Sequence, residues 1–316
     1  MQLNLPIEQH LSQSKSILIT GMGGGYDVFS GLPLYFELSR LGKTVHLANL
    51  SFADIVGVDD GEALTDTLVG ITADIEDSLD YFPEYYLSQW FDTIGEDITI
   101  WCFHKIGARP LAQNYKVLVK HLDIDAIILV DGGVDSLMHG DEPHAGTILE
   151  DSLSLLAVNE LSNIPVRIVA CLGMGVEYEI SYPHVFENIA HLTKQNAFWG
   201  SCALIKQMES YQQFEDAVLY VFDQQPQFPS VICSSIVSAV LGHYGDYHLI
   251  SRTKDSELHI SALMPMYWFF DLKTVARNNL LLPHLRLTFD IDEAWNAMTQ
   301  ARSNIEFRVT PQHPLR

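Results

Sequence analysis

The chain has 316 residues, of which 47% are hydrophobic and only 18% are charged, and its formal net charge is −22. This composition excludes a disordered chain, because it supplies enough apolar surface for a large core. The negative charge argues against binding to nucleic acid or to anionic membrane surfaces, which it would repel. No linker rich in proline, glycine or serine interrupts the sequence, so we expect a single α/β domain over residues 1–316.

The sequence carries no recognisable export or membrane signal. Residues 1–16 lack a basic stretch followed by an apolar run. The densest late apolar run, 262–270, contains Pro265 and falls well short of the ~20 residues that cross a bilayer. The four cysteines form no C-x-x-C pair and each has apolar neighbours. These features predict a cytoplasmic protein with reduced thiols.

Short apolar runs alternate with helical patterns over the first two thirds of the chain. The expected strands are 16–20, 44–50, 98–103, 125–130, 166–172 and 217–222. The fourth is almost wholly apolar, which is typical of a parallel strand buried on both faces. This alternation predicts a mostly parallel, doubly wound sheet with helices on both faces.

The regular alternation of expected strands and helices ends after residue 222. Residues 230–241 predict a helix closed by Gly242, and 247–252 and 258–263 predict two strands joined by a polar turn. We expect these elements to form an antiparallel elaboration of the sheet or a small subregion over about 243–316.

Residues 51–97 form an acidic insertion. They contain thirteen aspartates and glutamates and no lysine or arginine. The segment is too long for an ordinary strand–helix–strand connection, and a helix is expected from Pro83 to about Phe91. Two interpretations stay open: a solvated acidic face, or a lid over the site or a contact between two copies of the chain. The aromatic side chains on this helix support the second interpretation, because another part of the protein or a second copy must bury them.

A glycine loop, residues 21–25, follows the first strand directly and precedes a helix. Its four glycines are Gly21, Gly23, Gly24 and Gly25. They let the backbone turn sharply and approach a ligand, and the N–H groups of the next helix then suit an anion such as phosphate or carboxylate. Asp27 either faces this ligand or caps the turn. A purely structural tight turn is the alternative.

The glycine loop departs from the dinucleotide-binding fingerprint. Tyr26 occupies the last glycine position of G-x-G-x-x-G, and the second strand ends in Asn49 and Leu50, where an acidic residue is expected. A nicotinamide cofactor is therefore disfavoured. No G-x-x-x-x-G-K-[ST] loop is present either.

A second loop, 131–144, carries the densest set of chemical groups. Asp131 lies at the carboxyl end of the fourth strand, where open α/β sheets bind ligands. If strand order reverses between the first and fourth strands, this loop and the glycine loop face one crevice.

Carboxylates beside histidines suit proton transfer or a divalent cation. We expect Asp27, Asp131, Asp135 and Glu142 as catalytic groups, and Asp131, Asp135 and His139 as ligands of Mg²⁺ or another divalent metal. Further ligand contacts are expected from Gly132, Gly133 and Ser136. No H-E-x-x-H zinc motif is present, and the alternative for His139 and Glu142 is a solvated turn.

Two more residues are candidate ligand contacts. Glu177 lies in a glycine-containing loop after the fifth strand, and Asn278 follows the aromatic run 267–271. A surface carboxylate and a capping amide are the respective alternatives.

These motifs resemble the prokaryotic family labelled domain of unknown function 1152. The resemblance rests on Gly23–Val28, on Asp131–Leu137 with Gly140 and Glu142, and on Tyr267–Asp271 followed by Asn278. Tyr26 departs from the family's usual run of glycines. The resemblance implies a three-layer, Rossmann-like fold with both loops in one site, and it implies no reaction.

The leading functional hypothesis is a small-molecule enzyme. It would bind a phosphorylated or nucleotide-like ligand on the glycine loop and catalyse hydrolysis or group transfer, assisted by a divalent metal. A non-catalytic regulatory module with the same ligand site is the first alternative. A nicotinamide-dependent oxidoreductase is the second.

Overall fold

The computed structural model describes residues 6–58, 60–76, 79–144, 146, 148–176, 181–225 and 228–310. These residues form nine strands in one sheet, in the order β3-β4-β5-β2-β1-β6-β7-β9-β8. The strands are β1 (Ser16–Gly21), β2 (Thr44–Leu50), β3 (Glu62–Thr65), β4 (Leu68–Ile71), β5 (Ile100–Phe103), β6 (Ala126–Asp131), β7 (Val166–Cys171), β8 (Phe198–Ala203) and β9 (Met266–Asp271).

The centre of the sheet is parallel and doubly wound, as predicted. β1 pairs in parallel with both β2 and β6, and β5 and β7 continue the parallel set on either side. Gly21 at the end of β1 lies opposite Val130, and Asp131 lies opposite Cys171. The glycine loop and the 131–144 loop therefore leave adjacent strands at the same edge, where the winding direction reverses.

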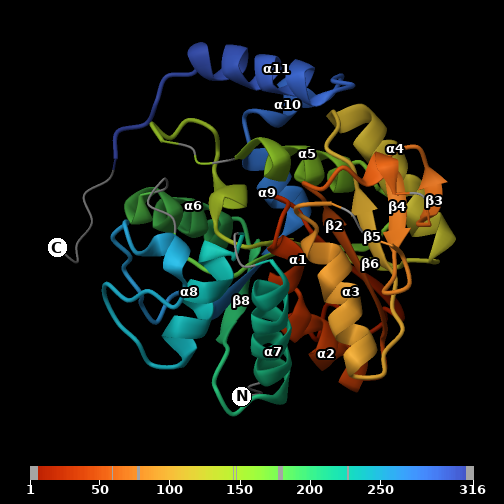
Figure 1. The fold of residues 1–316 in the computed structure, drawn as a ribbon. Helices are drawn as coiled ribbons and strands as arrows, with labels where there is room; N and C mark the ends of the chain where they lie inside the picture. The colour runs from red at the N-terminus through yellow and green to blue at the C-terminus, as the bar shows by residue number, and fades with distance from the viewer. Residues whose placement is uncertain are drawn as a thin grey trace.

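Helices cover both faces of the sheet (Figure 1). They are α1 (Asp27–Ser30), α2 (Leu32–Arg40), α3 (Pro83–Thr93), α4 (Ala108–His121), α5 (Ile148–Asn159), α6 (Tyr182–Lys194), α7 (Glu209–Gln224), α8 (Val231–Val240), α9 (Leu272–Asn278), α10 (Leu282–Leu285) and α11 (Ile291–Ser303). On β6, Ile127 and Leu129 join a core with α4, α5, α6, α9, α10 and α11, whereas Ala126, Ile128 and Val130 join a core with α1, α2, α3, α7 and α8. This alternation makes the fold three-layered and Rossmann-like.

One expected strand is wrong. Residues 217–222 lie inside α7, not in the sheet. The buried residues of this helix recur at three- and four-residue intervals; among them are Tyr211, Phe214, Ala217, Val218, Val221 and Phe222. This spacing is the apolar stripe of a helix, and the short β-branched run within it suggested a strand only when read alone.

The two expected strands at 247–252 and 258–263 are also wrong. In this region the structure has a 3₁₀ turn, Ser251–Thr253, and an isolated β-bridge that joins Gly245 to Ile260. The antiparallel elaboration is instead made by β9 and β8, which extend the sheet beyond β7. The helix expected at 230–241 is confirmed as α8, whose N-cap Ser230 accepts the N–H of Cys233.

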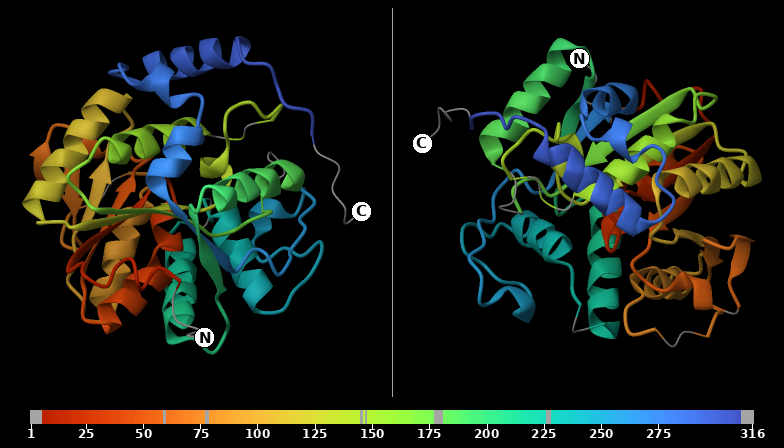
Figure 2. Two further views of the ribbon diagram at one scale, coloured as in Figure 1. Left: turned by 180° about the vertical axis from the view of Figure 1, so that it is seen from behind. Right: turned by 90° about the horizontal axis from the view of Figure 1, so that it is seen from above.

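The acidic insertion extends the other edge of the sheet. β4 pairs antiparallel with β5, and β3 pairs antiparallel with β4. α3 begins at Pro83, as predicted, and the Trp90 indole donates to Asp216 of α7 (2.9 Å). Seen from above, the insertion and the segment around α8 form two separate flanks (Figure 2). Among the described residues, no helix is both long and apolar enough to span a bilayer.

Candidate functional site

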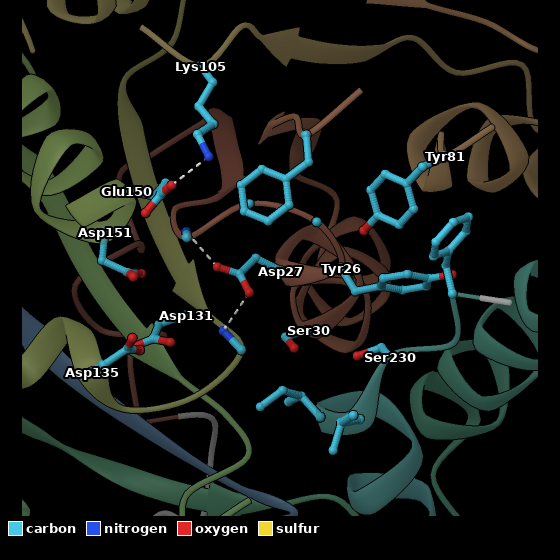
Figure 3. Close-up of a pocket in the computed structure, with 18 of the residues that line it drawn as sticks. Tyr26, Asp27, Ser30, Tyr81, Lys105, Asp131, Asp135, Glu150, Asp151 and Ser230 are labelled. Carbon is cyan, nitrogen blue, oxygen red and sulfur yellow. Dashed lines mark hydrogen bonds and ion pairs between the residues drawn. The ribbon is translucent and has the colours of Figure 1, made fainter. Parts of the chain in front are cut away.

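A cavity of about 550 Å³ lies at the carboxyl ends of β1 and β6 (Figure 3). Both loops singled out from the sequence contribute to it, together with the insertion, the start of α5 and the chain around α8. It is lined by Gly23, Gly24, Gly25, Tyr26, Asp27, Ser30, Phe52, Tyr81, Lys105, Asp131, Gly132, Asp135, Glu150, Asp151, Phe228, Ser230, Val231, Ile232 and Arg252.

The glycine loop needs glycine at the positions that face the cavity. Gly24 and Gly25 have φ of +97° and +59°, the left-handed region that favours glycine. A Cβ on Gly23 would lie 2.8 Å from Asp151 Oδ1 and 2.9 Å from Asp27 Oδ2. Gly21 has a different role from the one expected: it is buried at the end of β1, packed against Asn49, and does not line the cavity.

Asp27 joins the two loops. Its carboxylate accepts the N–H of Gly23 (2.6 Å) and the N–H of Gly132 (3.2 Å), which come from opposite sides of the β1–β6 boundary. A Cβ on Gly132 would lie 2.7 Å from Asp27 Oδ1. The missing side chains of these glycines therefore allow one carboxylate to bridge both backbones.

Asp131 accepts hydrogen bonds from a residue of its own loop. Its Oδ2 accepts the N–H of Ser136 (3.0 Å) and also the Ser136 hydroxyl, and the Cys171 thiol lies 3.8 Å away. Ser136 is therefore buried outside the cavity lining, and its two hydrogen bonds orient Asp131. Asp135 does line the cavity and is almost fully buried. Gly133 is buried and is not part of the described lining.

The sequence interpretation missed Asp151, in the first turn of α5. Oxygens of Asp27, Asp131 and Asp151 all lie within 4.8 Å of one another, and we call these residues the carboxylate trio. Asp151 is 2% exposed, and its Oδ1 has no hydrogen-bond partner among the described residues. Burial raises the pKa of Asp151 well above its usual range, and the charges of Asp135, Asp131 and Asp27 add to this.

His139 and Glu142 lie elsewhere, which corrects their expected place beside Asp131. After the 3₁₀ turn Asp135–Leu137 the chain leaves the cavity. His139, Asp141 and Glu142 form a second cluster, in which one nitrogen or oxygen atom of each side chain lies within 4.8 Å of the others. Glu142 is fully buried and pairs with Arg308 (2.5 Å). A carboxylate engaged in this way, outside the cavity lining, is not placed to act on a ligand there.

The structure describes one of the two remaining candidates. Asn278, the last residue of α9, accepts from the Gln195 side chain (3.3 Å) and does not line the cavity. Glu177 lies outside the described residues.

Cationic and aromatic side chains complete the lining. Lys105 pairs with Glu150 (2.9 Å) and lies 4.9 Å from the centroid of the Phe52 ring. Arg252 donates to the carbonyl of Pro229 (3.1 Å). Sequence reasoning missed these residues because each belongs to a different segment and none forms a motif with its neighbours.

The end of β2 is built differently from a nicotinamide site. Asn49 is buried beneath the glycine loop, where it donates to the carbonyl of Gly25 (2.8 Å) and to Glu84 Oε1 (2.7 Å). The position that carries a ribose-binding acid in dinucleotide-binding folds is thus used to support the loop.

A family model described as a protein of unknown function, DUF1152, matches residues 84–309, well over half of the chain. The chain belongs to the DUF1152 family. The DUF1152 match includes Asp131, Asp135 and Asp151, and it begins after the glycine loop and Asp27. No curated protein and no solved structure matches the chain.

Proposed function

We propose that this protein is a divalent-metal-dependent enzyme that hydrolyses, or transfers a group from, a phosphorylated small molecule. The carboxylate trio carries the proposal, because three separate elements bring its oxygens within 4.8 Å of one another. Carboxylate oxygens are the ligands that Mg²⁺ prefers in proteins. The buried Asp151 Oδ1, which lacks a partner among the described residues, supports a cation at this position.

The charge of the cavity also supports a metal. Five carboxylates and two cationic side chains are found in the described lining. They are Asp27, Asp131, Asp135, Glu150, Asp151, Lys105 and Arg252. Such a surface would repel a phosphate group on its own. A divalent ion at the trio would offset this repulsion, polarise the phosphate oxygens and acidify a bound water.

The chain's own residues have distinct parts in this proposal. Asp27 keeps the two loops in register through its backbone contacts. The pKa of Asp151 is raised by burial and by its acidic neighbours, and a cation bound at the trio would favour its ionised form. Asp135 lines the cavity without belonging to the trio and is our candidate general base for the attacking water.

The first test is a thermal shift with Mg²⁺ or Mn²⁺. At a hundredfold excess over its dissociation constant, the ion is expected to stabilise the protein by about 2.7 kcal/mol, a rise of several degrees in Tm. Asp151→Asn is expected to abolish this shift while the metal-free Tm stays equal or rises, because a neutral amide of the same shape replaces a buried carboxyl whose ionisation its acidic neighbours oppose. In the wild type the shift should grow as pH rises and Asp151 loses its proton.

Asp255→Asn is the control for this test, since Asp255 is exposed and outside the cavity lining. It should retain the full metal shift. Equal shifts in wild type and Asp151→Asn, or no shift in the wild type, would contradict the metal site.

The second test separates binding from catalysis. Asp135→Asn keeps the shape of the side chain and removes its charge, so we expect the metal shift to persist and Tm to change little. Turnover of a general phosphate ester, p-nitrophenyl phosphate, should fall about a hundredfold or more if Asp135 is the base. Unchanged turnover would remove Asp135 from this role. Metal-dependent binding of phosphate esters without any turnover in the wild type would favour a regulatory module.

We also propose a cytoplasmic location and a small-molecule partner. None of the four cysteines is disulfide-bonded, and three of them are buried. This state supports a reducing compartment.

A further inference from the structure

The end of the cavity away from the carboxylate trio is aromatic. Four aromatic residues line the cavity here, and we call them the aromatic end: Tyr26 directly after the glycine loop, Phe52 and Tyr81 of the acidic insertion, and Phe228 before α8. Figure 3 shows the carboxylates gathered on one side of Asp27 and the tyrosines on the other. The cavity thus has one strongly acidic end and one end with large apolar surfaces.

Three of these rings pack against one another edge to face, so their faces are not stacked on one another. Tyr81 meets Phe228 edge to face (centroids 5.4 Å, 88°) and Tyr26 edge to face (6.5 Å, 62°). Phe52 remains 48% exposed although it lies directly on Gly24, where a Cβ would come within 2.4 Å of the ring. The Phe52 ring packs on the backbone of Gly24 and leaves about half of its surface exposed in the cavity wall. Such a surface suits a flat apolar ligand.

Polar groups accompany these rings. The Tyr26 hydroxyl and Ser30 Oγ are buried and lack a hydrogen-bond partner among the described residues. Burial raises the pKa of the Tyr26 phenol far above the physiological range, so its hydroxyl keeps its proton and can donate. Arg252 also lines the cavity, and its positive charge acts on the hydroxyls of both Tyr26 and Tyr81. A ligand at the aromatic end therefore meets flat faces together with hydrogen-bond donors.

We propose that the aromatic end binds the heterocyclic base of a nucleotide whose phosphate lies at the carboxylate trio; this inference rests on the proposed function. A base offers a flat π-face to the rings and polar edges to the donors. A sugar phosphate alone would leave the rings uncovered, and an organic cation would lie beside Arg252. The volume of about 550 Å³ falls in the ~300–1,000 Å³ range of small-molecule sites.

The experiment measures binding of AMP, GMP, CMP, UMP and ribose 5-phosphate in saturating Mg²⁺ by calorimetry. At least one nucleotide should bind roughly tenfold or more tightly than ribose 5-phosphate, which has the phosphate and sugar but no base. Phe52→Ala should weaken that nucleotide by roughly tenfold or more and leave ribose 5-phosphate unchanged.

Phe289→Ala is the matched control. Phe289 is 55% exposed, and Arg109 lies 5.0 Å from its ring centroid much as Lys105 lies over Phe52, but it is outside the cavity lining. This variant should bind every probe like the wild type.

The outcomes separate the base site from the metal site. If no nucleotide binds better than ribose 5-phosphate, or if Phe52→Ala and Phe289→Ala behave alike, the base site is overturned while Mg²⁺-dependent binding of both phosphates still supports the proposed function. If a nucleotide binds without Mg²⁺, equally well in Asp151→Asn, and is lost in Phe52→Ala, the base site stands and the metal proposal fails.

Discussion

Replacing Glu84 with glutamine is expected to raise the free energy of unfolding by about 3 kcal/mol at pH 8 and to leave it nearly unchanged at pH 4. Glu84 is fully buried on α3, and burial raises its pKa to about 7. Its Oε1 accepts from Asn49, and its Oε2 has no partner among the described residues. Glutamine keeps the shape and the accepting oxygen and removes the charge.

The sign of this change in the free energy of unfolding follows from proton linkage. In the unfolded chain Glu84 titrates near 4.5, whereas in the folded protein it titrates near 7, so between these values the folded state binds more protons. Stability contributed by the protonated form is therefore complete below about pH 4.5 and is lost as pH rises to about 7. A shift of that size corresponds to roughly 3 kcal/mol at 1.36 kcal/mol per pH unit.

Urea denaturation of both proteins at pH 4, 5.5 and 8 provides the measurement. Glu76→Gln, at an exposed position of the same insertion, is the control and should show no such difference. If wild type and Glu84→Gln keep a constant difference across the three pH values, Glu84 is not the titrating group. Because Asn49 links Glu84 to the glycine loop, the same experiment reports how firmly that loop is supported.

The central sheet could be predicted from the sequence because burial on both faces leaves a clear mark. The run 126–130 has no polar residue, and it is β6 in the structure. Asp131, directly after this run, could be predicted as a site residue for the same reason, since a carboxylate at the end of an apolar strand is conspicuous in the sequence. Strands at the edges, such as β3 and β8, are partly exposed and leave no comparable pattern.

Asp151 could not be found in this way. An acidic residue in the first turn of a helix is ordinary, because it complements the positive end of the helix dipole. Only the tertiary structure shows that this end of α5 faces Asp27. One signal was available in the sequence: residues 148–159 are mostly apolar, which predicts a largely buried helix, and a carboxylate within such a helix needs a partner or a ligand.

The place of Glu142 also depends on distant parts of the chain. Its partner Arg308 lies 166 residues later, a separation over which local patterns carry no information. The same holds for the aromatic end, whose four rings are far apart in sequence. Local pattern therefore located the loops at the edge of the sheet, and long-range packing decided which of their side chains meet.

Replacing Arg308 with methionine is expected to lower the free energy of unfolding by roughly 3–5 kcal/mol, because a buried carboxylate loses its partner. The guanidinium contacts four side chains at once. Nε donates to Asp141 (2.7 Å), Nη1 to Glu187 (2.7 Å), and Nη2 to Glu142 (2.5 Å) and Asn188 (2.9 Å). Of these, Glu142 is completely buried and is the main source of the expected loss.

This ion-pair cluster connects the C-terminal segment to the site. Burial opposes ionisation of Glu142, but hydrogen bonds from Asn188 and from the N–H groups of His139 and Gly140 outweigh it and hold its pKa below the usual range. Asn188 also donates to the carbonyl of Leu137 (3.1 Å), in the 3₁₀ turn that begins at Asp135. Loss of Arg308 should therefore loosen the loop that carries Asp131 and Asp135.

Urea denaturation at pH 7 measures this effect against a surface pair. Arg286, 67% exposed and 3.0 Å from Glu160, is the control, and Arg286→Met should cost less than about 1 kcal/mol. Adding Glu142→Gln to Arg308→Met should restore part of the stability, since the unpaired charge is then gone. Equal losses in Arg308→Met and Arg286→Met, or no recovery in the double variant, would mean that the buried charge of Glu142 is not what Arg308 stabilises.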